Sequence, residues 1–474
     1  MNYFFIGIGG IGMSAIARYI HQIGNVVAGY DLTPSPLTTE LENEGIAVFY
    51  DDTPNTMPQN IDVYIYTPAV PKDTAVYQWA AASGKPIKKR AEMLGELTNG
   101  KKCIAVAGTH GKTSTSTMIA HLLSKSSLGC NAFLGGISKN YNSNVLINSK
   151  SDYVVVEADE YDRSFLQLHP FFSVITSIDP DHLDIYGDYE HLHDAFIQFA
   201  SQTQPNGKLF LKQGISLSEE SEGHKGQNTS EYSEQSHPEP TLTTHYSPHT
   251  IPVVSYTTSS IEADYYAWNV RTSRGNIYYD LRTPKGVIYD IELHHTALYN
   301  VENSVAAAAV ALECGLNEFE LREGLKSYEG VRRRFDFRIE TKDVVYIDDY
   351  AHHPREIAAT LDSIRFLYPG KRIVGIFQPH LYSRTSDFAD QFAEVLSTLD
   401  EAVLLPIYPA REKPIPGVSS GMILHRMHSM SKYLVTKEQL ADLIPALYPD
   451  ILVTIGAGDI DRLIPQIEKI LSEN

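Results

Sequence analysis

A lysine and a hydroxyl residue follow two glycines in the segment AGTHGKTSTSTM, residues 107–118, directly after an apolar stretch. In a phosphate loop, backbone amides surround the phosphates, a lysine such as Lys112 neutralises the γ-phosphate, and a hydroxyl such as that of Thr113 binds Mg²⁺. The full pattern has a glycine five residues before Gly111, where this chain has Val106. The segment still predicts an ATP site, and a chance Gly-Lys-Thr between a strand and a helix is the alternative.

The chain opens with a second glycine-rich turn, GIGGIG, between an apolar strand and a helical pattern. Gly7, Gly9 and Gly12 match Gly-x-Gly-x-x-Gly, in which the glycines let the backbone approach a pyrophosphate at a helix N-terminus. A tight turn without a ligand is the alternative interpretation. Asp31, after the second strand, would suit the ribose of NAD or of a UDP-sugar equally. The pattern therefore predicts a diphosphate ligand and leaves its identity open.

Acidic residues follow two later strands. Glu157 ends the apolar strand of DYVVVEADEYDRSF, where a metal ion opposite the phosphate loop would explain it. A solvated strand end is the alternative. The next strand leads to SIDPDHLDIYGD, in which His182 could bind a second metal ion through a neutral nitrogen or serve a structural role. These residues predict a metal site beside the phosphate loop and leave the role of His182 open.

Two loops in the last third of the chain carry further polar residues. YIDDYAHHP contains Asp349 and His352, and FQPHLYSRT contains His380 and Arg384. The planar guanidinium of Arg384 could bind a carboxylate through two hydrogen bonds, which a lysine does less well. These loops are therefore candidates for binding a carboxylate.

The elements that must position these residues alternate between short strands and helices, which predicts parallel sheets with right-handed crossovers. A chain of 474 residues is too long for one core, because single cores stop growing at roughly 250 to 300 residues. New units start at KKCIAVAG and after GVRRRFDFR. We expect an α/β fold of three domains: a Rossmann-like N-terminal domain at 1–98, a central P-loop ATP-binding domain at 99–330 and a C-terminal Rossmann-like α/β domain at 331–474.

The expected central domain contains one segment of a different composition. Residues 213–252 are dominated by Ser, Glu, His, Thr and Pro, which cannot bury enough apolar surface to offset the entropy of ordering. We interpret this segment as a mobile insertion. The strands YYAWNV, IYYDLRT and GVIYDIEL after it are expected to be antiparallel, and NVENSVAAAAVALECG is expected to form a helix.

Composition and charge exclude some classes of protein. The formal net charge of −19 argues against a protein whose main ligand is nucleic acid or an anionic membrane, since both favour a basic surface. Three scattered cysteines predict no disulfide framework and a reducing cytoplasm. The apolar N-terminus lacks the basic start of a signal peptide, Arg18 follows it closely, and no apolar run approaches the ~20 residues of a membrane span.

Taken together and in this order, these segments resemble the Mur ligase family, the ATP-dependent amide-forming enzymes of bacterial peptidoglycan synthesis. The segments that carry the resemblance extend over nearly the whole chain. They are GIGGIGMSAIA, TPAVPKD, KRAEMLGEL, AGTHGKTSTST, EADEYDRSF, PDHLDIYGD, YNVENSVAAAA, GVRRRFDFR, DDYAHHP, FQPHLYSRT and TIGAGDID.

The resemblance implies a reaction, its substrates and its cofactor. L-Alanine would be joined to the lactyl carboxylate of UDP-N-acetylmuramate at the expense of ATP, with Mg²⁺ bound. The carboxylate attacks the γ-phosphate to form an acyl phosphate, which the amine then attacks. Attachment of a recycled peptide to the same sugar nucleotide is the alternative. We expect small-molecule substrates, no nucleic acid or membrane partner, and a monomer or weak homodimer in the cytoplasm.

The resemblance also implies the residues of each site. An ATP site would be formed by Gly108, Thr109, His110, Gly111, Lys112, Thr113, Ser114, Asn300, Asn303 and Asp349. A sugar-nucleotide site would be formed by Gly7, Gly9, Gly10, Ile11, Gly12, Asp31, Thr67 and Arg90. The catalytic residues would be Lys112, Glu157, His182, His352 and His380. Metal ions would be bound by Thr113, Glu157 and His182, and the amino acid by His380 and Arg384, with His352 in the same pocket.

The sequence departs from the family pattern in three places. Tyr299 stands where the family often has a histidine before the asparagine, which weakens the assignment of the nucleobase contact. Leu381 follows His380 where some members have an arginine, which leaves Arg384 as the expected partner of the alanine carboxylate. The insertion at 213–252 is not a feature expected of the family.

Two other classes of function remain open at the level of the sequence. A dinucleotide-dependent oxidoreductase would use GIGGIG but would leave the phosphate loop and the acidic residues without a role. A nucleotide-binding switch protein would hydrolyse ATP slowly and would need no sugar nucleotide. Phosphate release that depends on each substrate in turn would distinguish these functions from a ligase.

Overall fold

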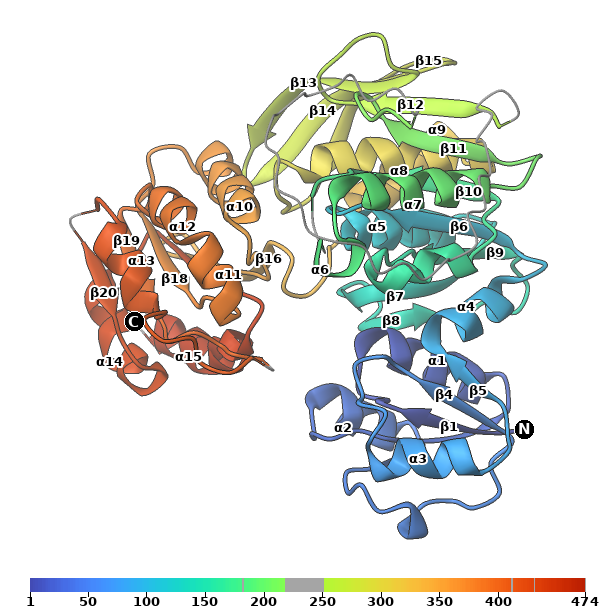
Figure 1. The fold of residues 1–474 in the computed structure, drawn as a ribbon. Helices are drawn as coiled ribbons and strands as arrows, with labels where there is room; N and C mark the ends of the chain where they lie inside the picture. The colour runs from blue at the N-terminus through green and yellow to red at the C-terminus, as the bar shows by residue number, and fades with distance from the viewer. Residues whose placement is uncertain (181–182, 218–250, 411, 430, 474) are drawn as a thin grey trace, which may run out of the picture.

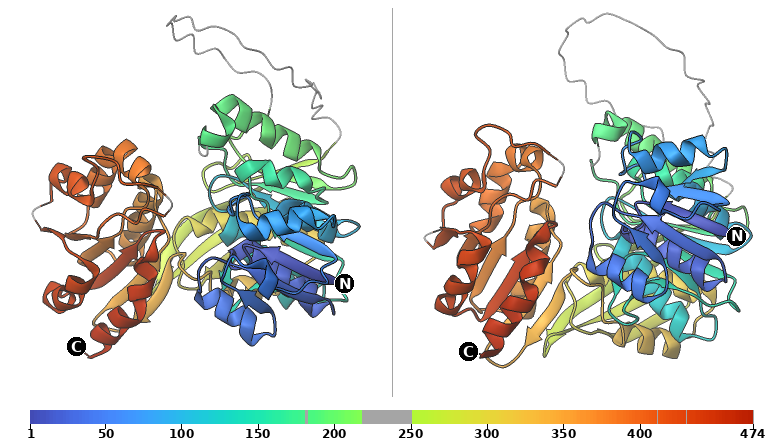
Figure 2. Two further views of the ribbon diagram at one scale, coloured as in Figure 1. Left: turned by 60° about the horizontal axis from the view of Figure 1, so that its bottom comes forward. Right: turned by 90° about the horizontal axis from the view of Figure 1, so that it is seen from below.

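The computed structural model describes residues 1–180, 183–217, 251–410, 412–429 and 431–473. Within these ranges the chain forms three sheets that follow one another along the sequence, each packed against helices (Figure 1). The predicted α/β fold with three domains is confirmed. The domain boundaries at 98/99 and 330/331 stay predictions. Figure 2 shows the N-terminal and C-terminal domains on different sides of the central domain.

The N-terminal domain is a parallel sheet with the strand order β3-β2-β1-β4-β5. The strands are β1 (Asn2–Ile6), β2 (Val26–Tyr30), β3 (Ala47–Phe49), β4 (Val63–Tyr66) and β5 (Ile87–Lys89). The helices are α1 (Ile11–Gln22), α2 (Pro36–Asn43), α3 (Ala75–Ala82) and α4 (Arg90–Thr98), with a 3₁₀ turn η1 at Pro54–Thr56. The order reverses between β1 and β4, and ligands of such sheets bind outside the strand ends at this point.

The central domain is a mixed sheet with the order β15-β14-β13-β12-β11-β10-β6-β9-β7-β8. Its strands are β6 (Lys102–Ala107), β7 (Asn131–Ser138), β8 (Ser143–Leu146), β9 (Tyr153–Glu157), β10 (Phe172–Ile175), β11 (Lys208–Lys212), β12 (Val253–Thr257), β13 (Tyr265–Ser273), β14 (Asn276–Thr283) and β15 (Gly286–Leu293). Its helices are η2 (Tyr161–Gln167), α5 (Lys112–Lys125), α6 (Leu183–Tyr186), α7 (Tyr189–Ser201), α8 (Asn300–Cys314) and α9 (Glu318–Lys326). The predicted antiparallel pairing of β13, β14 and β15 and the predicted helix α8 are confirmed.

The predicted insertion at 213–252 is described only at its two ends. Leu217 and Ile251 are each 8% exposed and belong to the apolar core of the domain. The rest of the predicted insertion, residues 218–250, lies outside the described residues. The composition of the whole segment therefore concealed two apolar residues that pack.

The C-terminal domain has the strand order β16-β17-β21-β18-β19-β20, parallel except for β16 against β17. The strands are β16 (Asp336–Glu340), β17 (Val345–Asp349), β18 (Ile373–Phe377), β19 (Glu401–Leu404), β20 (Lys432–Leu434) and β21 (Ile451–Ile455). The helices are α10 (Pro354–Leu367), α11 (Tyr382–Asp387), α12 (Ala389–Leu396), α13 (Ser420–Arg426), α14 (Lys437–Leu447), η3 (Asp459–Leu463) and α15 (Ile464–Glu473). As in the first domain, the predicted site loops follow the carboxyl ends of parallel strands.

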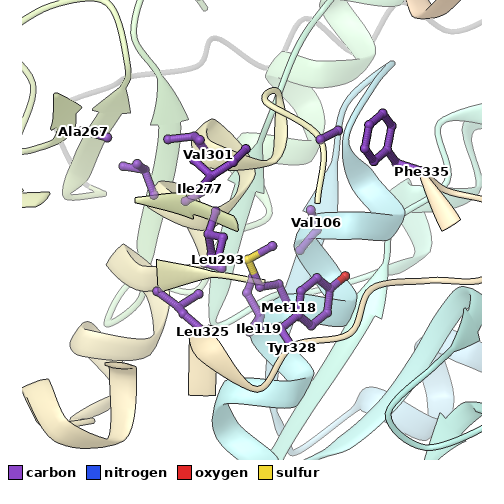
Figure 3. Close-up of a cluster of buried hydrophobic side chains, with 14 of the residues drawn as sticks. Val106, Met118, Ile119, Ala267, Ile277, Leu293, Val301, Leu325, Tyr328 and Phe335 are labelled. Atoms are coloured by element: carbon purple, nitrogen blue, oxygen red, sulfur yellow. The ribbon is translucent and has the colours of Figure 1, made fainter. Parts of the chain in front are cut away.

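The helices α5 and α8 form the centre of the core that supports the phosphate loop. Figure 3 shows Met118 and Ile119 of α5 in the same apolar cluster as Val301 of α8. The side chains Ala306–Ala309 have no exposed surface, because small residues let a helix lie close to its neighbours. Burial of every residue from Thr113 to Leu123 fixes α5, whose first turn carries predicted ATP residues. None of the helices in the described ranges is both long and apolar enough to cross a membrane.

Candidate active site

The predicted phosphate loop connects β6 to α5 and has a backbone that only glycine adopts readily. Gly108 and Gly111 have φ of +138° and +82°, in a region that other residues rarely occupy. A Cβ atom on Gly108 would lie 2.1 Å from Oγ1 of Thr176, so a larger residue would collide there. The loop leads directly into the N-terminus of a helix, where free amides and the helix dipole favour an anion.

Ser177, just after β10, holds this loop from the neighbouring strand. The amide of Thr109 donates to the Ser177 carbonyl at 3.2 Å, and the amide of His110 donates to Oγ of Ser177 at 2.8 Å. Oγ1 of Thr109 lies 2.8 Å from the same Oγ. The loop is therefore pre-organised by its own domain, which reduces the cost of ordering it around a phosphate.

Lys112 follows Gly111 at the start of α5, and its side chain is charged. Its Nζ donates to the Gly108 carbonyl at 2.6 Å and to Oε1 of Glu160 at 2.8 Å. Burial lowers the pKa of the Lys112 amine, but the carboxylates of Glu160 and Glu157 outweigh burial, and the pKa lies above its ordinary value. Lys112 is thus positioned to bind a phosphate, which would take the place of Glu160 as its partner.

Glu157 ends β9 beside the phosphate loop, because β9 pairs in parallel with β6 and places Glu157 opposite Val106. Its carboxylate lies against Gly135 of β7, where a Cβ atom would come within 2.1 Å of Oε2. This Oε2 atom is buried and accepts no hydrogen bond from the residues that the structure describes. A buried carboxylate oxygen without a donor fits a group that binds a cation.

The predicted metal site is described only in part. Thr113 is 6% exposed at the start of α5, and with Glu157 it offers the oxygen ligands that Mg²⁺ prefers. His182, the third predicted ligand, lies outside the described residues. In the described ranges no group of three or more His, Cys, Asp or Glu side chains is placed to hold a metal ion.

A cavity of about 490 Å³ lies between the N-terminal and central domains, within the range of roughly 300 to 1,000 Å³ for small-molecule sites. Its walls include residues predicted for the sugar nucleotide together with the carboxylate predicted to be catalytic: Gly10, Ile11, Gly12, Thr67, Arg90 and Glu157. Asp159, Tyr161 and Asp162 also line it. One continuous space therefore joins the N-terminal glycine loop to the reaction site predicted beside the phosphate loop.

The N-terminal glycine loop is held differently from the phosphate loop. Gly7 has φ of +89° and its amide donates to the Tyr30 carbonyl at 2.7 Å. The amide of Gly9 donates to Oδ2 of Asp31 at 2.8 Å. Asp31, predicted to contact a ribose, therefore supports the loop itself, and its contact with a ligand stays a prediction.

Asn144 of β8 connects the central domain to this loop. Its side-chain amide donates to the Ile11 carbonyl at 2.6 Å and to Oγ of Ser14 at 2.9 Å, and its carbonyl accepts from Arg18 at 2.6 Å. Arg18 is 3% exposed and pairs with Glu40 and Glu44 of its own domain at 3.0 and 2.8 Å. The start of α1 is thus fixed by a buried side chain of the next domain.

Two ion pairs join the N-terminal to the central domain, and Arg90, Asp159 and Asp162 of these pairs line the cavity. Nη2 of Arg90 lies 2.9 Å from Oδ2 of Asp159, and Nζ of Lys89 lies 3.1 Å from Oδ2 of Asp162. An anionic ligand in the cavity would compete with Asp159 for Arg90. Arg90 was predicted for the sugar nucleotide, and Lys89 was not.

The predicted nucleobase residues begin helix α8. Asn300 is 5% exposed and its amide donates to Oγ1 of Thr296 at 2.7 Å. The amide of Asn303 donates to Oδ1 of Asn300 at 2.8 Å, and a Cβ atom on Gly111 would lie 2.7 Å from Oδ1 of Asn303. Asn303 therefore rests on the phosphate loop, whereas Asn300 is directed into the domain.

Asp349 lies in the C-terminal domain and is 3% exposed. Its Oδ2 accepts from the Phe335 amide at 3.0 Å and from Oγ1 of Thr360 at 3.2 Å, and its Oδ1 accepts from the Ala351 amide at 2.8 Å. Burial raises the pKa of Asp349 to about 6. The carboxylate is already occupied within its domain, so its predicted contact with the ATP ribose stays a prediction.

The three residues predicted for the amino acid lie together. The rings of His352 and His380 have centroids 6.1 Å apart, and Nη1 of Arg384 lies 3.4 Å from Nδ1 of His380. Burial lowers the pKa of His380 to about 4, and the charges of His352 and Arg384 act in the same direction. Leu381, between them, has φ of +69°, a strained conformation of the kind found at binding sites.

Sequence reasoning missed three residues that position the site: Glu160, Ser177 and Asn144. Glu160 lies in the acidic run EADEYD, so clustered acids next to Glu157 were a usable signal. Ser177 begins the quoted segment SIDPDHLDIYGD but was given no role there, and Asn144 is a single polar residue outside every quoted segment. Their roles depend on which strands are neighbours, which no local pattern in the sequence indicates.

Three family models match successive parts of the chain. Residues 2–102 match the Mur ligase family catalytic domain, residues 106–311 the Mur ligase middle domain, and residues 333–458 the Mur ligase glutamate ligase domain. Together they span the N-terminal, central and C-terminal sheets.

Similar proteins match over the full length. UDP-N-acetylmuramate–L-alanine ligase of Porphyromonas gingivalis is 48% identical over 474 residues, covering 99% of this chain and 98% of that protein. The enzyme of the same name from Flavobacterium johnsoniae is 43% identical, covering 100% and 98%. The crystal structure of UDP-N-acetylmuramate-alanine ligase from Thermotoga maritima superposes with a TM-score of 0.81 at 26% identity and covers 100% of both chains. The chain therefore belongs to the Mur ligase family.

Proposed function

We propose that this protein joins L-alanine to the lactyl carboxylate of UDP-N-acetylmuramate in an ATP-dependent reaction of peptidoglycan precursor synthesis. The observation that carries the proposal is the cavity of about 490 Å³ that extends from the glycine loop at 7–12 to Glu157. It is supported by the full-length similarity to relatives with this name. A sugar nucleotide bound at the glycine loop would direct its far end towards the ATP site.

The chemistry requires activation of the carboxylate, because a carboxylate and an amine do not condense in neutral water. An oxygen of the lactyl carboxylate forms a bond to the γ-phosphorus of ATP, ADP leaves, and an acyl phosphate results. The neutral amine of alanine then attacks the acyl carbon, phosphate leaves, and the amine nitrogen loses a proton. Such a reaction depends mainly on positioning and on stabilisation of negative charge.

The protein's own residues supply these two contributions. Lys112 places a positive charge beside the loop amides, where negative charge builds up on the transferring phosphoryl group. Glu157 and the hydroxyl of Thr113 would hold Mg²⁺, which when bound neutralises phosphate charge. Arg90, which lines the cavity, would bind the diphosphate of the sugar nucleotide, with Lys89 next to it in the chain.

The amino acid is assigned to the loops after β17 and β18. Arg384 would bind the alanine carboxylate through two hydrogen bonds, and His380 and His352 would line the pocket. Burial lowers the pKa of both histidines, so both are neutral at pH 7 and do not repel a protonated amine. A neutral imidazole can also accept the proton that the amine must lose.

The remaining expectations follow from this function. Its substrates are small molecules, and we expect no nucleic acid or membrane partner and a monomer or weak homodimer. The free cysteines Cys103, Cys130 and Cys314 support a reducing cytoplasmic location.

Phosphate release tests the proposal. Purified protein is supplied with ATP, Mg²⁺, UDP-N-acetylmuramate and L-alanine, and each component is omitted in turn. We expect release only when all are present, with an amide product of the mass of the alanine conjugate. Efficient release with a recycled tripeptide but not with alanine would support the alternative ligase. Release without any sugar nucleotide would contradict both.

A further inference from the structure

Glu356, in the first turn of α10, contacts both the phosphate loop and the amino-acid pocket. Its Oε2 accepts from the amides of His352 at 3.0 Å and His353 at 3.3 Å. Its Oε1 lies 3.4 Å from Nδ1 of His110, an ion pair rather than an aligned hydrogen bond. The two oxygens of one carboxylate therefore reach two parts of the site that belong to different domains.

A second ion pair lies next to the pair of Glu356 and His110. In this second pair α10 supplies the basic residue and the loop side supplies the acid. Nη1 of Arg355 lies 3.2 Å from Oδ1 of Asp179, whose amide donates to Oγ1 of Thr109 in the phosphate loop at 3.0 Å. Oδ2 of Asp179 lies 3.8 Å from Nε2 of His110. Adjacent residues of α10, one basic and one acidic, thus face an acid and a histidine at the phosphate loop. Such an alternation fixes one alignment of the two surfaces and disfavours others.

Glu356 is also connected to the residues of the predicted amino-acid pocket. The backbone amide of His352 donates a hydrogen bond to Glu356. The His352 ring lies beside His380, and His380 lies beside Arg384. Movement of α10 would therefore shift the pocket relative to the phosphate loop. A shift of about 1 Å between two reacting groups can cost about 10²-fold in rate.

We propose that Glu356 is a positioning residue, which through His110 and His352 aligns the amino-acid pocket with the acyl phosphate formed at the phosphate loop. The inference rests on the proposed function. It predicts that loss of the Glu356 charge affects the second half-reaction, in which the amine attacks, more than the first, in which ATP is used. ADP formation and amide formation then become unequal, because an acyl phosphate without an aligned amine is lost to water.

The Glu356→Gln substitution tests this role. Glutamine also serves at the third position of a capping box, so the start of α10 is kept while the charge facing His110 is lost. We expect KM for alanine to rise about tenfold, within the range of coupling energies for contacting residues. KM for ATP should change less than twofold, and more than one ADP should form per amide.

The matched control is Glu320→Gln in α9. Glu320 occupies the same position of a capping box, with the Asn317 amide donating to its Oε2 at 3.0 Å, but it lies on another helix, in the central domain. It should leave KM for alanine and the ratio of ADP to amide unchanged. Glu356→Asp, which keeps the charge, should restore part of the coupling.

The results separate the inference from the proposed function. If the unmodified protein forms no alanine-dependent amide, the proposed function fails. If it does, and Glu356→Gln keeps a ratio of one ADP per amide and an unchanged KM for alanine, the inference is overturned. The same holds if Glu356→Gln lowers kcat alone, or if both glutamine variants change the kinetics equally, because a purely structural role would do so.

Discussion

The two glycine-rich loops each join a strand to a helix but are held in different ways. The phosphate loop at 107–114 is fixed by Ser177 of its own domain and carries its own cation, Lys112. The glycine loop at 7–12 carries no cation in its sequence, and α1 behind it is fixed by Asn144 of the neighbouring domain. The glycine loop therefore depends on the neighbouring domain for the position of α1, whereas the phosphate loop is held within its own domain.

Removal of the cation from the phosphate loop should have the largest effect. Lys112→Ala should lower kcat by about 10²- to 10³-fold, since one charge-stabilising group at such a site contributes roughly 3 to 4 kcal/mol. KM for the sugar nucleotide should hardly change, because that ligand is proposed to bind at the other loop. Steady-state kinetics measures both constants, and thermal unfolding checks that the variant is folded.

Lys125→Ala is the control for this variant. Lys125 ends the same helix, α5, and is exposed, so its loss removes the same type of charge far from the loop. It should retain kcat. Nearly normal turnover of a folded Lys112→Ala variant would remove the phosphate loop from the mechanism and would end the contrast between the two loops.

Loss of the buried amide behind the glycine loop should have the next largest effect. Asn144→Ala leaves the Ile11 carbonyl, Oγ of Ser14 and Nη1 of Arg18 without this partner. Each buried polar group without a partner costs about 1 to 3 kcal/mol, so we expect a loss of roughly 3 kcal/mol in the free energy of unfolding. KM for the sugar nucleotide should rise, while KM for ATP should not.

Asn140→Ala is the matched control, because Asn140 is half-buried near the same hairpin and bonds the Ser327 carbonyl at 2.8 Å within its own domain. Urea unfolding and sugar-nucleotide kinetics should show a smaller effect than Asn144→Ala. Equal effects of the two variants would mean that the glycine loop does not depend on the central domain.

The same contrast explains which parts of the molecule could be predicted from the sequence. Apolar runs followed by glycine and a helical pattern predicted both loops, because a strand, a turn and a helix N-terminus are local features. The position of Glu157 at a strand end was also local. The contacts of Ser177, Asn144 and Glu356 could not be predicted, because they join segments far apart in sequence.

The residue roles inferred from the family resemblance also fall into two groups, those supported by local position and those that depend on the folded neighbours. His352, His380 and Arg384 lie together as the family pattern implied. Asp349 and Asp31, assigned to riboses, use their carboxylates inside the protein. A motif predicts which residue stands at a strand end, but the number of hydrogen bonds that its side chain already makes depends on the folded neighbours.

Replacement of Arg384 should affect neither loop. Arg384→Lys keeps the charge but loses the bidentate geometry, so KM for alanine should rise about tenfold, with little change for ATP or the sugar nucleotide. Alaninamide, which lacks the carboxylate, should be a poor donor for the unmodified protein and should lose little more in the variant. If alanine and alaninamide lose equally, Arg384 does not bind the carboxylate, and an arginine of GVRRRFDFR is the better candidate.

The smallest expected effect is the pH dependence of the contact between the phosphate loop and α10. The Glu356 carboxylate raises the pKa of His110 above its ordinary value, with Asp179 acting in the same direction and burial and Lys112 against it. Burial raises the pKa of Glu356, but the contact with His110 and the neighbouring His352 outweighs burial and holds this pKa well below its usual range.

The sign of the pH effect follows from these two directions. A histidine whose pKa is raised in the folded state adds stability below its unfolded pKa of about 6.5, and this stability is lost as the pH rises through the folded pKa. Glu356 stays ionised throughout this range. The difference in free energy of unfolding between the unmodified protein and Glu356→Gln should therefore be larger at pH 6 than at pH 9. Because both groups are partly exposed, we expect about 1 kcal/mol or less, reduced further by salt. Urea unfolding at the two pH values measures it, and a difference that grows towards pH 9 would show that His110 is not the partner of Glu356.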